Sequence, residues 1–184
     1  MTALVRPDAR LARAWAAMMA DFGGWDEAHG SGYWWAEEPP PYGEGDCAAF
    51  VDLVLAHEPP ADPPSTRVGS TFFWIAEGSE EEPGELVGFL NTRHRLNDFL
   101  LEQGGHIGYS VRPSARRRGH ASRALALAVR DAGQRLGIDR VLVTCDDDNL
   151  PSAATIERNG GVLEDVRGIK RRYWIDARTA AVTR

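Results

Sequence analysis

Cysteine is scarce in this chain of 184 residues, and long apolar runs are missing from it. The two cysteines, Cys47 and Cys145, are far apart and form no CxxC or Cys–His spacing, so neither a disulfide framework nor a zinc site is expected. The absence of any run of about 18 apolar residues argues against a membrane span. Met1–Ala20 has early charges and no continuous apolar core, which argues against a signal peptide. Reduced thiols in a cytoplasmic protein are the favoured interpretation.

An excess of positive charge is also missing. The formal net charge is −6, so we expect no nucleic-acid partner and no binding to an anionic membrane. The sequence has no GxGxxG, and no acidic ribose ligand follows its RxxGxA segment (Arg116–Ala121) at the expected distance, which disfavours a dinucleotide site. The hydrophobic fraction of 43% and the charged fraction of 26% are those of an ordinary globular protein.

Hydrophobic periodicity and Gly/Pro punctuation divide the chain into about four helices and six strands, with Asp46 and Gly137 as predicted helix caps. Helices are predicted over Pro7–Met19, Asp46–His57, Gly119–Leu136 and Asn149–Asn159, with a short helical turn at Asn97–Gln103. Strands are predicted over Ser70–Glu77, Glu85–Arg95, His106–Val111, Arg140–Cys145, Val162–Arg167 and Arg171–Asp176. This order predicts one α+β domain over residues 1–184 around a mixed, mostly antiparallel central sheet.

The strongest chemical signal lies where the predicted strand His106–Val111 meets a tight basic loop that opens a helix. Backbone N–H groups in the first turn of a helix have no partner within it and, with the helix dipole, favour an anion. Gly119 and the small Ala121 let a phosphate approach the backbone closely, and the arginines 116–118 add positive charge. The alternative is a solvated basic turn, but the strand before and the helix after favour phosphate binding.

The loop resembles the cofactor motif of the GNAT superfamily of N-acetyltransferases, Q/R-x-x-G-x-G/A, at Arg116, Gly119 and Ala121. The segments GGHIGYSVRPSARRRGHA, LVTCDDDNLPSAATIERNGG and RRYWI are similar to those of a subgroup of predicted acetyltransferases in that superfamily. The resemblance covers roughly Leu86–Ile175, whereas the first 65 residues resemble the subgroup chiefly at His29–Gly32. It implies the GNAT fold, with a splayed pair of parallel strands, and acetyl-CoA as the acetyl donor.

The resemblance also implies which residues hold acetyl-CoA. The pantetheine arm would lie between the two splayed strands and pair with the backbone of the first, while the loop N–H groups would hold the pyrophosphate. Asn149 would hydrogen-bond the arm, and Ser152 either helps or is only a first-turn helix residue. The implied cofactor-binding residues are Tyr109, Ser110, Val111, Arg116, Arg117, Arg118, Gly119, His120, Ala121, Asn149 and Ser152.

Acetyl transfer to an amine needs a base for the amine proton and a donor for the oxyanion. The resemblance implies the Val111 N–H as the oxyanion donor. The family often has a glutamate base on the strand before the loop, and here that place is held by His106, whose imidazole suits proton transfer near pH 7. The alternative is a structural histidine bonded to a neighbouring strand, and His94, Asp98 and Glu102 are rival bases.

The acid that protonates the departing thiolate is where this sequence leaves the family pattern. Many members carry a tyrosine seven residues after the position of Asn149, and here that residue is Ile156. Either the thiolate leaves unassisted or another hydroxyl substitutes. Tyr173 on the last strand is the predicted substitute, and its alternative role is that of a half-buried strand aromatic.

The acceptor side is predicted in residues 1–65, which supply the N-terminal helices and a loop rich in Gly, Pro and aromatic residues. Residues 66–176 supply the sheet and the acetyl-CoA-binding core. Trp34 and Trp35 are predicted to stack on or cage an amine, with plain core packing as the alternative, and His29 and His94 complete the predicted substrate-binding residues.

The sequence therefore predicts an enzyme that moves an acetyl group from acetyl-CoA to a primary amine of a small molecule or peptide, by direct attack in a ternary complex. No metal is expected, because the three aspartates 146–148 fit helix capping and solvation better than a metal site. The alternative is a non-catalytic acetyl-CoA-binding regulatory domain, which would suit the missing tyrosine. A homodimer is compatible with the sequence.

Overall fold

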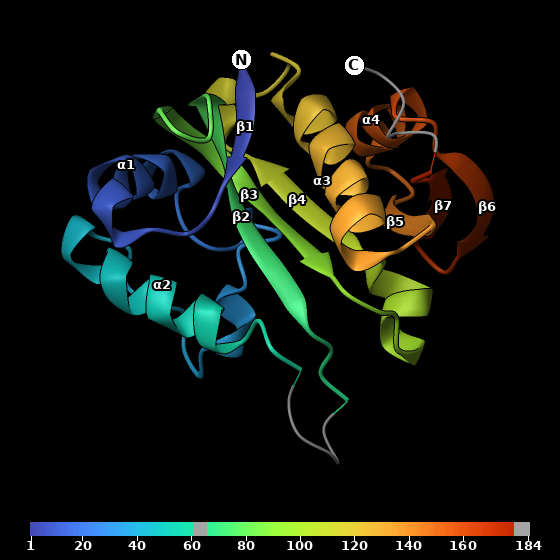
Figure 1. Ribbon diagram of the computed structural model, residues 1–184, viewed down its shortest axis with the longest axis horizontal. Coiled ribbons are helices and arrows are strands. Elements are labelled where there is room, and N and C mark those ends of the chain that lie inside the picture. Colours follow the sequence, from blue (N-terminus) through green and yellow to red (C-terminus); the bar gives the residue numbers. More distant parts are fainter. Residues whose placement is uncertain (61–65, 179–184) are drawn as a thin grey trace.

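The strands form two antiparallel sheets in the computed structural model, which describes residues 1–60 and 66–178. The first sheet has the order β1-β2-β3-β4 and the second the order β5-β7-β6 (Figure 1). The strands are β1 (Thr2–Val5), β2 (Ser70–Gly78), β3 (Pro83–Arg93), β4 (Ile107–Val111), β5 (Arg140–Asp146), β6 (Val162–Arg167) and β7 (Lys170–Asp176).

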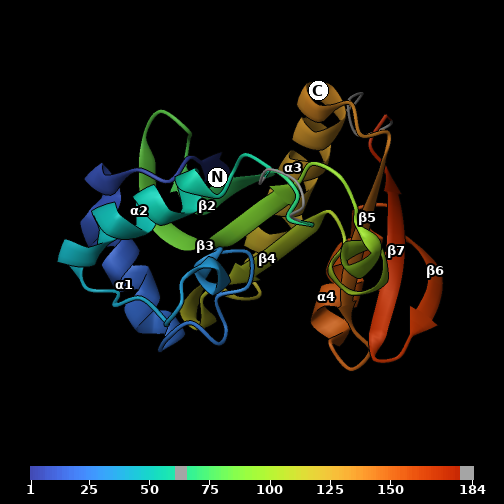
Figure 2. The ribbon, with the colours of Figure 1, turned by 90° about the horizontal axis from the view of Figure 1, so that it is seen from below.

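Helices cover both faces of the four-stranded sheet. The helices α1 and α2 pack on one face, whereas α3 packs on the other and α4 lies beside β5 and β7 (Figures 1 and 2). The α-helices are α1 (Ala12–Phe22), α2 (Cys47–Ala56), α3 (His120–Leu136) and α4 (Leu150–Arg158), and the short helices are η1 (Ala9–Leu11), η2 (Tyr33–Trp35), η3 (Glu44–Asp46), η4 (Leu100–Gly104) and η5 (Pro113–Ala115). Within the described ranges, no helix is long and apolar enough to cross a membrane.

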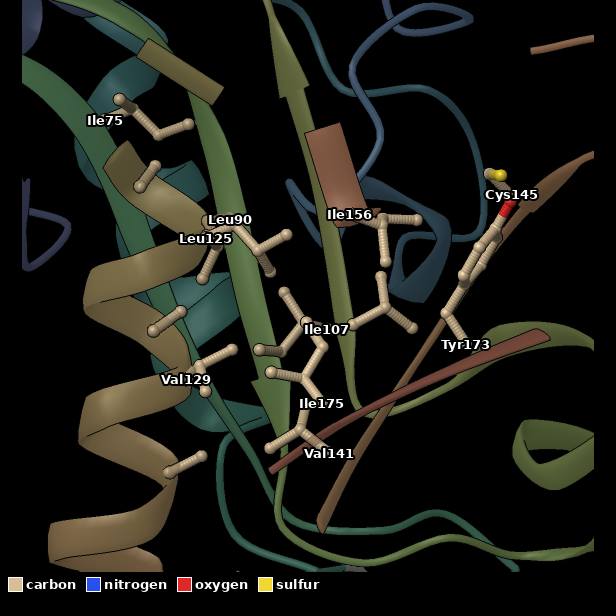
Figure 3. Packing of buried hydrophobic residues seen from close by; sticks show 14 of the residues in the cluster. Ile75, Leu90, Ile107, Leu125, Val129, Val141, Cys145, Ile156, Tyr173 and Ile175 are labelled. Carbon is tan, nitrogen blue, oxygen red and sulfur yellow. The ribbon is translucent and has the colours of Figure 1, made fainter. Parts of the chain in front are cut away.

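Alternation along β2 and β3 builds a separate core on each face. Trp74 and Phe89 point toward α1 and α2, where they join a cluster rich in aromatic side chains. Ile75 and Leu90 point the other way, toward Leu125 and the rest of α3 (Figure 3). Because both faces of the sheet are covered, its inner strands are apolar in both directions, and each large side chain buried there contributes roughly 1.5–3 kcal/mol.

The predicted α+β class and the GNAT fold are confirmed, and the predicted hairpin is the β2–β3 pair. One strand was missed. Thr2–Val5 forms β1 at the edge of the sheet, antiparallel to β2 with Thr2 opposite Glu77. The strand has four residues and no alternating pattern, so its sequence carries no periodic signal, and its pairing with a distant strand defines it.

Two helix starts also differ from the prediction. The first helix was predicted from Pro7, but α1 begins at Ala12 because Asp8 caps the preceding short helix η1. Asp46 was predicted to cap α2 through its side chain. Instead its carboxylate turns back and accepts a hydrogen bond from the Gly43 N–H at 2.8 Å. Gly137 ends α3 in the left-handed conformation, as predicted.

The predicted central sheet is divided at the point where β4 and β5 face each other. These strands are joined through α3, a crossover connection that makes them run in the same direction. They touch where β4 begins, since the His106 N–H donates to the Leu142 carbonyl at 2.7 Å. Beyond that point the strands diverge (Figure 2), which is the splayed pair that the resemblance implies.

Candidate active site

A cavity of about 910 Å³ opens along the split between β4 and β5. Its walls come from parts of the chain that are distant in sequence: the loop between α1 and α2, the residues before β2, the end of β3, the segment around η4, the split strands themselves, the start of α4 and the first residue of β7. The lining includes His29, Trp34, Asn91, Arg93, Gly108, Tyr109, Cys145, Asp146, Asn149, Ser152 and Lys170.

The free edge of β4 forms one wall of the cavity. The pattern of hydrogen bonds between β4 and β3 determines which backbone groups of β4 face the split. Arg93 N–H donates to His106 O and Arg112 N–H donates to Val87 O, so the even-numbered residues of β4 exchange hydrogen bonds with β3. The N–H and C=O groups of Tyr109 and Val111 therefore point away from β3, toward β5. This orientation leaves the Val111 N–H and the Tyr109 backbone open to a ligand in the split.

Ser110, which lies between these two residues, does not direct its backbone groups to the split. Its backbone faces β3, and its buried hydroxyl donates to the His29 carbonyl at 2.8 Å. Next to it, Gly30 packs so closely on β4 that a Cβ there would lie 2.5 Å from the Gly108 carbonyl oxygen. Ser110 thus ties the loop that carries His29 to the cavity wall.

His106, the predicted general base, lies at the closed end of the split and does not line the cavity. Its side chain is 6% exposed, and its Nδ1 accepts a hydrogen bond from the Leu142 N–H at 2.9 Å. Burial, with the nearby charge of Arg93, lowers the pKa of His106 to about 4. The ring is neutral at pH 7 and its lone pair is in use, so the geometry matches the structural alternative rather than a base.

The predicted phosphate loop has a helix N-terminus open to a ligand. Gly119 is the N-cap residue of α3 at φ +82°, and within the described part of the chain no side chain caps this end. Arg117, two residues earlier, is also left-handed at φ +62°, an unusual conformation for a residue with a side chain. The first-turn N–H groups and the dipole of α3 therefore face outward at the mouth of the loop.

The three arginines of the loop differ in their partners. Arg116 donates from Nε to the Val111 carbonyl at 2.9 Å and pairs with Glu27 at 3.0 Å. Arg118 pairs with Glu77 at 2.8 Å. Arg117 is exposed and has no ion pair with any described residue, so it carries the free positive charge of the loop.

His120 and Ala121 begin α3 in different surroundings. His120 is 5% exposed, with Nδ1 3.0 Å from the Thr2 hydroxyl and Nε2 3.2 Å from Glu77. Its imidazole therefore links α3 to β1 and β2, and only its backbone faces the loop. Ala121 is half-buried against the core beneath α3.

Across the split, Tyr109 of β4 meets α4. Asn149 caps α4 by accepting a hydrogen bond from the Ser152 N–H at 3.1 Å, and the Ser152 hydroxyl lies 3.0 Å from the Tyr109 hydroxyl. Burial raises the pKa of Tyr109 to about 12, so its hydroxyl stays protonated. All three side chains line the cavity, and they bring a phenol to the place where the two strands part.

Tyr173 and Ile156 lie in the core instead. Ile156 is fully buried and packs beside Ile107 (Figure 3). Tyr173 is also fully buried, next to Cys145, and its hydroxyl donates to Glu157 at 3.2 Å. Burial raises the pKa of Tyr173, and neither this residue nor Ile156 lines the cavity.

Of the predicted substrate-binding residues, His29 and Trp34 line the cavity and are exposed, and Trp34 contacts Tyr33 edge to face. The side chain of Trp35 lies outside the part of the structure that is described. His94 is elsewhere, on a smaller hollow beside Arg135, where its Nε2 lies 2.8 Å from the Thr71 hydroxyl. Burial, followed by the charge of Arg135, lowers the pKa of His94.

Two cavity residues, Asn91 and Arg93, were not singled out from the sequence. They follow the apolar stretch of β3 and point to the same face as the paired glycine, Gly108. The signal that could have identified them is a polar residue at each inward position of the last part of a strand that is otherwise apolar. Among residues 1–60 and 66–178, no group of three His, Cys, Asp or Glu side chains could hold a metal ion.

Comparisons with known proteins agree with this geometry. A family model described as an acetyltransferase (GNAT) domain matches residues 4–162, whereas no curated protein sequence matches the chain. Mycobacterium smegmatis RimJ in complex with CoA-disulfide is similar in fold, with a TM-score of 0.62 and 20% identity over 97% of this chain and 89% of that one.

Two other solved structures share the fold at lower identity. One is a ribosomal L7/L12 α-N-protein acetyltransferase, RimL, in complex with coenzyme A (TM-score 0.60, 18% identity, 95% of this chain and 94% of that one). The other is a variant of the spermidine N-acetyltransferase SpeG from Vibrio cholerae (TM-score 0.60, 14% identity, 98% and 96%). Because the family model spans most of the 184 residues, the chain belongs to the GNAT family of acetyltransferases.

Proposed function

We propose that this acetyltransferase moves an acetyl group from acetyl-CoA to the primary amine of a small molecule or peptide. The observation that carries the proposal is the cavity along the free edge of β4, which joins the outward N–H groups of that strand to an open acceptor side. A cytoplasmic location and independence of metal remain part of the prediction. The fold alone does not select an acceptor, since similar structures are named for ribosomal-protein and for spermidine acetylation.

The residues present fit acetyl-CoA. The uncapped N-terminus of α3 and the left-handed Gly119 suit a pyrophosphate, and the free edge of β4 suits the amides of a pantetheine arm. Gly119 has φ +82°, a conformation that residues with a side chain rarely adopt, and a Cβ there would have to displace the Arg123 guanidinium, 2.6 Å away. Bound acetyl-CoA supplies the thioester carbonyl that the amine attacks.

The chain itself supplies groups for the two charges that develop during transfer. The outward Val111 N–H is oriented to donate to the oxyanion of the attacked carbonyl. The Tyr109 hydroxyl, protonated and at the cavity wall, is the proposed donor of the proton that the leaving thiolate takes up. His29 is the histidine that lines the cavity, and its imidazole is the proposed acceptor of the amine proton.

The roles predicted for His106 and Tyr173 stay predictions, and the geometry counts against them. The His106 lone pair is bonded to Leu142, and the Tyr173 hydroxyl is bonded to Glu157 in the core. Neither residue reaches the cavity where the acceptor would bind.

The test is release of free CoA thiol on mixing the protein with acetyl-CoA and a panel of amines, amino acids and peptides, with mass spectrometry of the acceptor. Acetyl-CoA binding measured by calorimetry accompanies it. Acetylated product from a primary amine supports the proposal. Tight acetyl-CoA binding with no acetylated product from any acceptor would support the non-catalytic alternative instead.

A further inference from the structure

The acceptor side of the cavity contains a buried polar atom without a partner. Asn91 is 2% exposed, and its Oδ1 accepts no hydrogen bond from any described residue. Leaving a buried acceptor unpaired costs about 1–3 kcal/mol, so such an atom usually has a role. Asn91 lines the cavity but its Oδ1 is itself covered, so a rotation of the side-chain amide would bring this oxygen to a ligand N–H.

Beside it lies Arg93, whose positive charge has no anionic partner among the described residues. Arg93 donates from Nη1 to the carbonyls of Gly104 and Gly105, at 2.9 and 3.1 Å, and no carboxylate of the described residues pairs with it. Burial lowers the pKa of Arg93 to about 10, and no acidic neighbour offsets that effect. A guanidinium in such surroundings favours a bound carboxylate, because the planar fork can pair with both carboxylate oxygens.

These two groups converge on one place. Both residues point from β3 over Gly108, the residue paired with Asn91 on β4. A Cβ built on Gly108 would lie 3.0 Å from the Asn91 Oδ1 and 3.5 Å from an Nη of Arg93. A hydrogen-bond acceptor and a cation thus lie a few ångströms apart above a residue without a side chain, near the start of β4.

The remaining charges of the cavity do not suit a polycation. The lining contains one carboxylate, Asp146, among the described residues, and it is already paired with Lys170. Among the described residues, the lining therefore offers a polyamine no carboxylate that is free of a cationic partner.

We propose that the acceptor is an amine with a carboxylate on the neighbouring carbon, as in a free α-amino acid, held by Asn91 at the amine and by Arg93 at the carboxylate. The inference rests on the proposed function and names the substrate class of that same site. The exposed rings of Trp34 and Phe99 at the cavity would then face the amino acid's own side chain.

The experiment compares acceptors that differ only in the carboxylate. All L-amino acids are assayed for thiol release with acetyl-CoA, and the best one is then compared with its amide, with the amine that lacks the carboxyl group, and with spermidine. We expect kcat/KM to fall at least about 10-fold from the amino acid to the amide and further to the amine, because Arg93 loses its partner.

Variants separate recognition from folding. Arg93→Met should lower kcat/KM for the amino acid by about 100-fold while changing that for the matched amine by no more than about 3-fold. Arg95→Met, the same change on an exposed residue two positions away, is the control. Asn91→Leu should raise KM for the amino acid. It should leave the melting temperature unchanged or raise it, because it removes an unpaired polar atom. Asn91→Asp, in contrast, keeps an oxygen at this position.

The outcomes distinguish this inference from the proposed function. Acetylation of amines without any preference for a carboxylate, or an equal loss on every acceptor in Arg93→Met, would overturn the inference and leave the proposed function intact. If no amino acid is acetylated and none competes with an amine that is, the inference is also overturned. Absence of acetylation with every acceptor overturns both.

Discussion

The two ends of the cavity differ in how their polar side chains are paired. At the donor end, Arg116 and Arg118 are bonded to Glu27 and Glu77, and His120 contacts Thr2. At the acceptor end, and within the described part of the chain, the Asn91 Oδ1 has no hydrogen-bond partner and Arg93 is bonded to backbone carbonyls but to no carboxylate. We therefore expect the donor end to bind mainly through backbone groups that the fold already holds in place, and the acceptor end to depend on side chains whose hydrogen bonds a ligand completes.

This difference separates what the fold determines from what the individual sequence determines. A helix N-terminus and a free strand edge bind a phosphate and an extended arm with almost any side chains nearby. Specificity for an acceptor requires particular polar atoms at particular places. Substitutions should consequently separate into those that remove acetyl-CoA binding and those that change only the acceptor.

The largest effect is expected from Gly119→Glu. A side chain at φ +82° is strained, would displace the Arg123 guanidinium and would place a negative charge against the pyrophosphate. We expect acetyl-CoA affinity, measured by calorimetry, to fall on the order of 1,000-fold, or about 4 kcal/mol. The matched control is Gly137→Glu at the other end of α3, which has φ +67° and open space around it. Equal acetyl-CoA affinity in the two variants would contradict the assignment of the phosphate site to this loop.

The strand–loop–helix arrangement of the donor end was predictable from the sequence because its residues are contiguous. Val111 to Ala121 contains the end of a strand, the loop and the start of α3, so local patterns predict these elements. Its side-chain pairing was not predictable, since Glu27 and Glu77 are distant in sequence from the arginines that they contact.

The acceptor end was only partly predictable, because it is assembled from distant segments. Trp34 was predicted from a loop rich in aromatic residues, and His29 was predicted in the same loop; both line the cavity. Asn91 and Arg93 lie in a strand whose pattern shows only that it is buried, and their convergence over Gly108 depends on the register of β3 with β4. Tyr109 was expected to act through its backbone, because nothing in the sequence brings its hydroxyl to Ser152.

The pH dependence of the free energy of unfolding tests whether His106, at the closed end of the split, has a structural role. Its pKa is about 4 when folded and about 6.5 in an unfolded chain, so the unfolded state binds the proton first as the pH falls. Its contribution to stability is therefore present above pH 6.5 and declines toward pH 4, by about 3 kcal/mol in total. Guanidinium unfolding at several pH values should show this slope in the natural chain and a smaller one in His106→Asn.

The same variant distinguishes the two roles of His106. An asparagine oxygen can accept the Leu142 N–H, so His106→Asn should keep kcat within about 3-fold of the natural enzyme. A loss of 100-fold or more, which is typical for removal of a general base, would restore the catalytic role.

Tyr109→Phe tests the proposed acid at the point where donor and acceptor ends meet. Removing the hydroxyl should lower kcat about 10-fold without changing acetyl-CoA affinity. Ser152→Ala removes the partner of that hydroxyl but keeps the phenol, so its effect on kcat should be smaller. Because the pKa of Tyr109 is raised to about 12, its ionisation should not limit the rate below about pH 11. A loss of kcat in Tyr173→Phe that matches or exceeds the loss in Tyr109→Phe would assign the acid to the core tyrosine.

The smallest effect is expected from Arg117→Ala, which removes the exposed charge of the loop that has no ion pair with a described residue. The N–H groups of α3 would remain, so acetyl-CoA affinity should fall by only about 3- to 5-fold at low ionic strength, and by less at 1 M salt because screening weakens exposed charges. Arg13→Ala, which removes an exposed arginine of α1, is the control for net charge. A 100-fold loss in Arg117→Ala would mean that a side chain, rather than the backbone, holds the pyrophosphate, and the two ends of the cavity would then bind by the same principle.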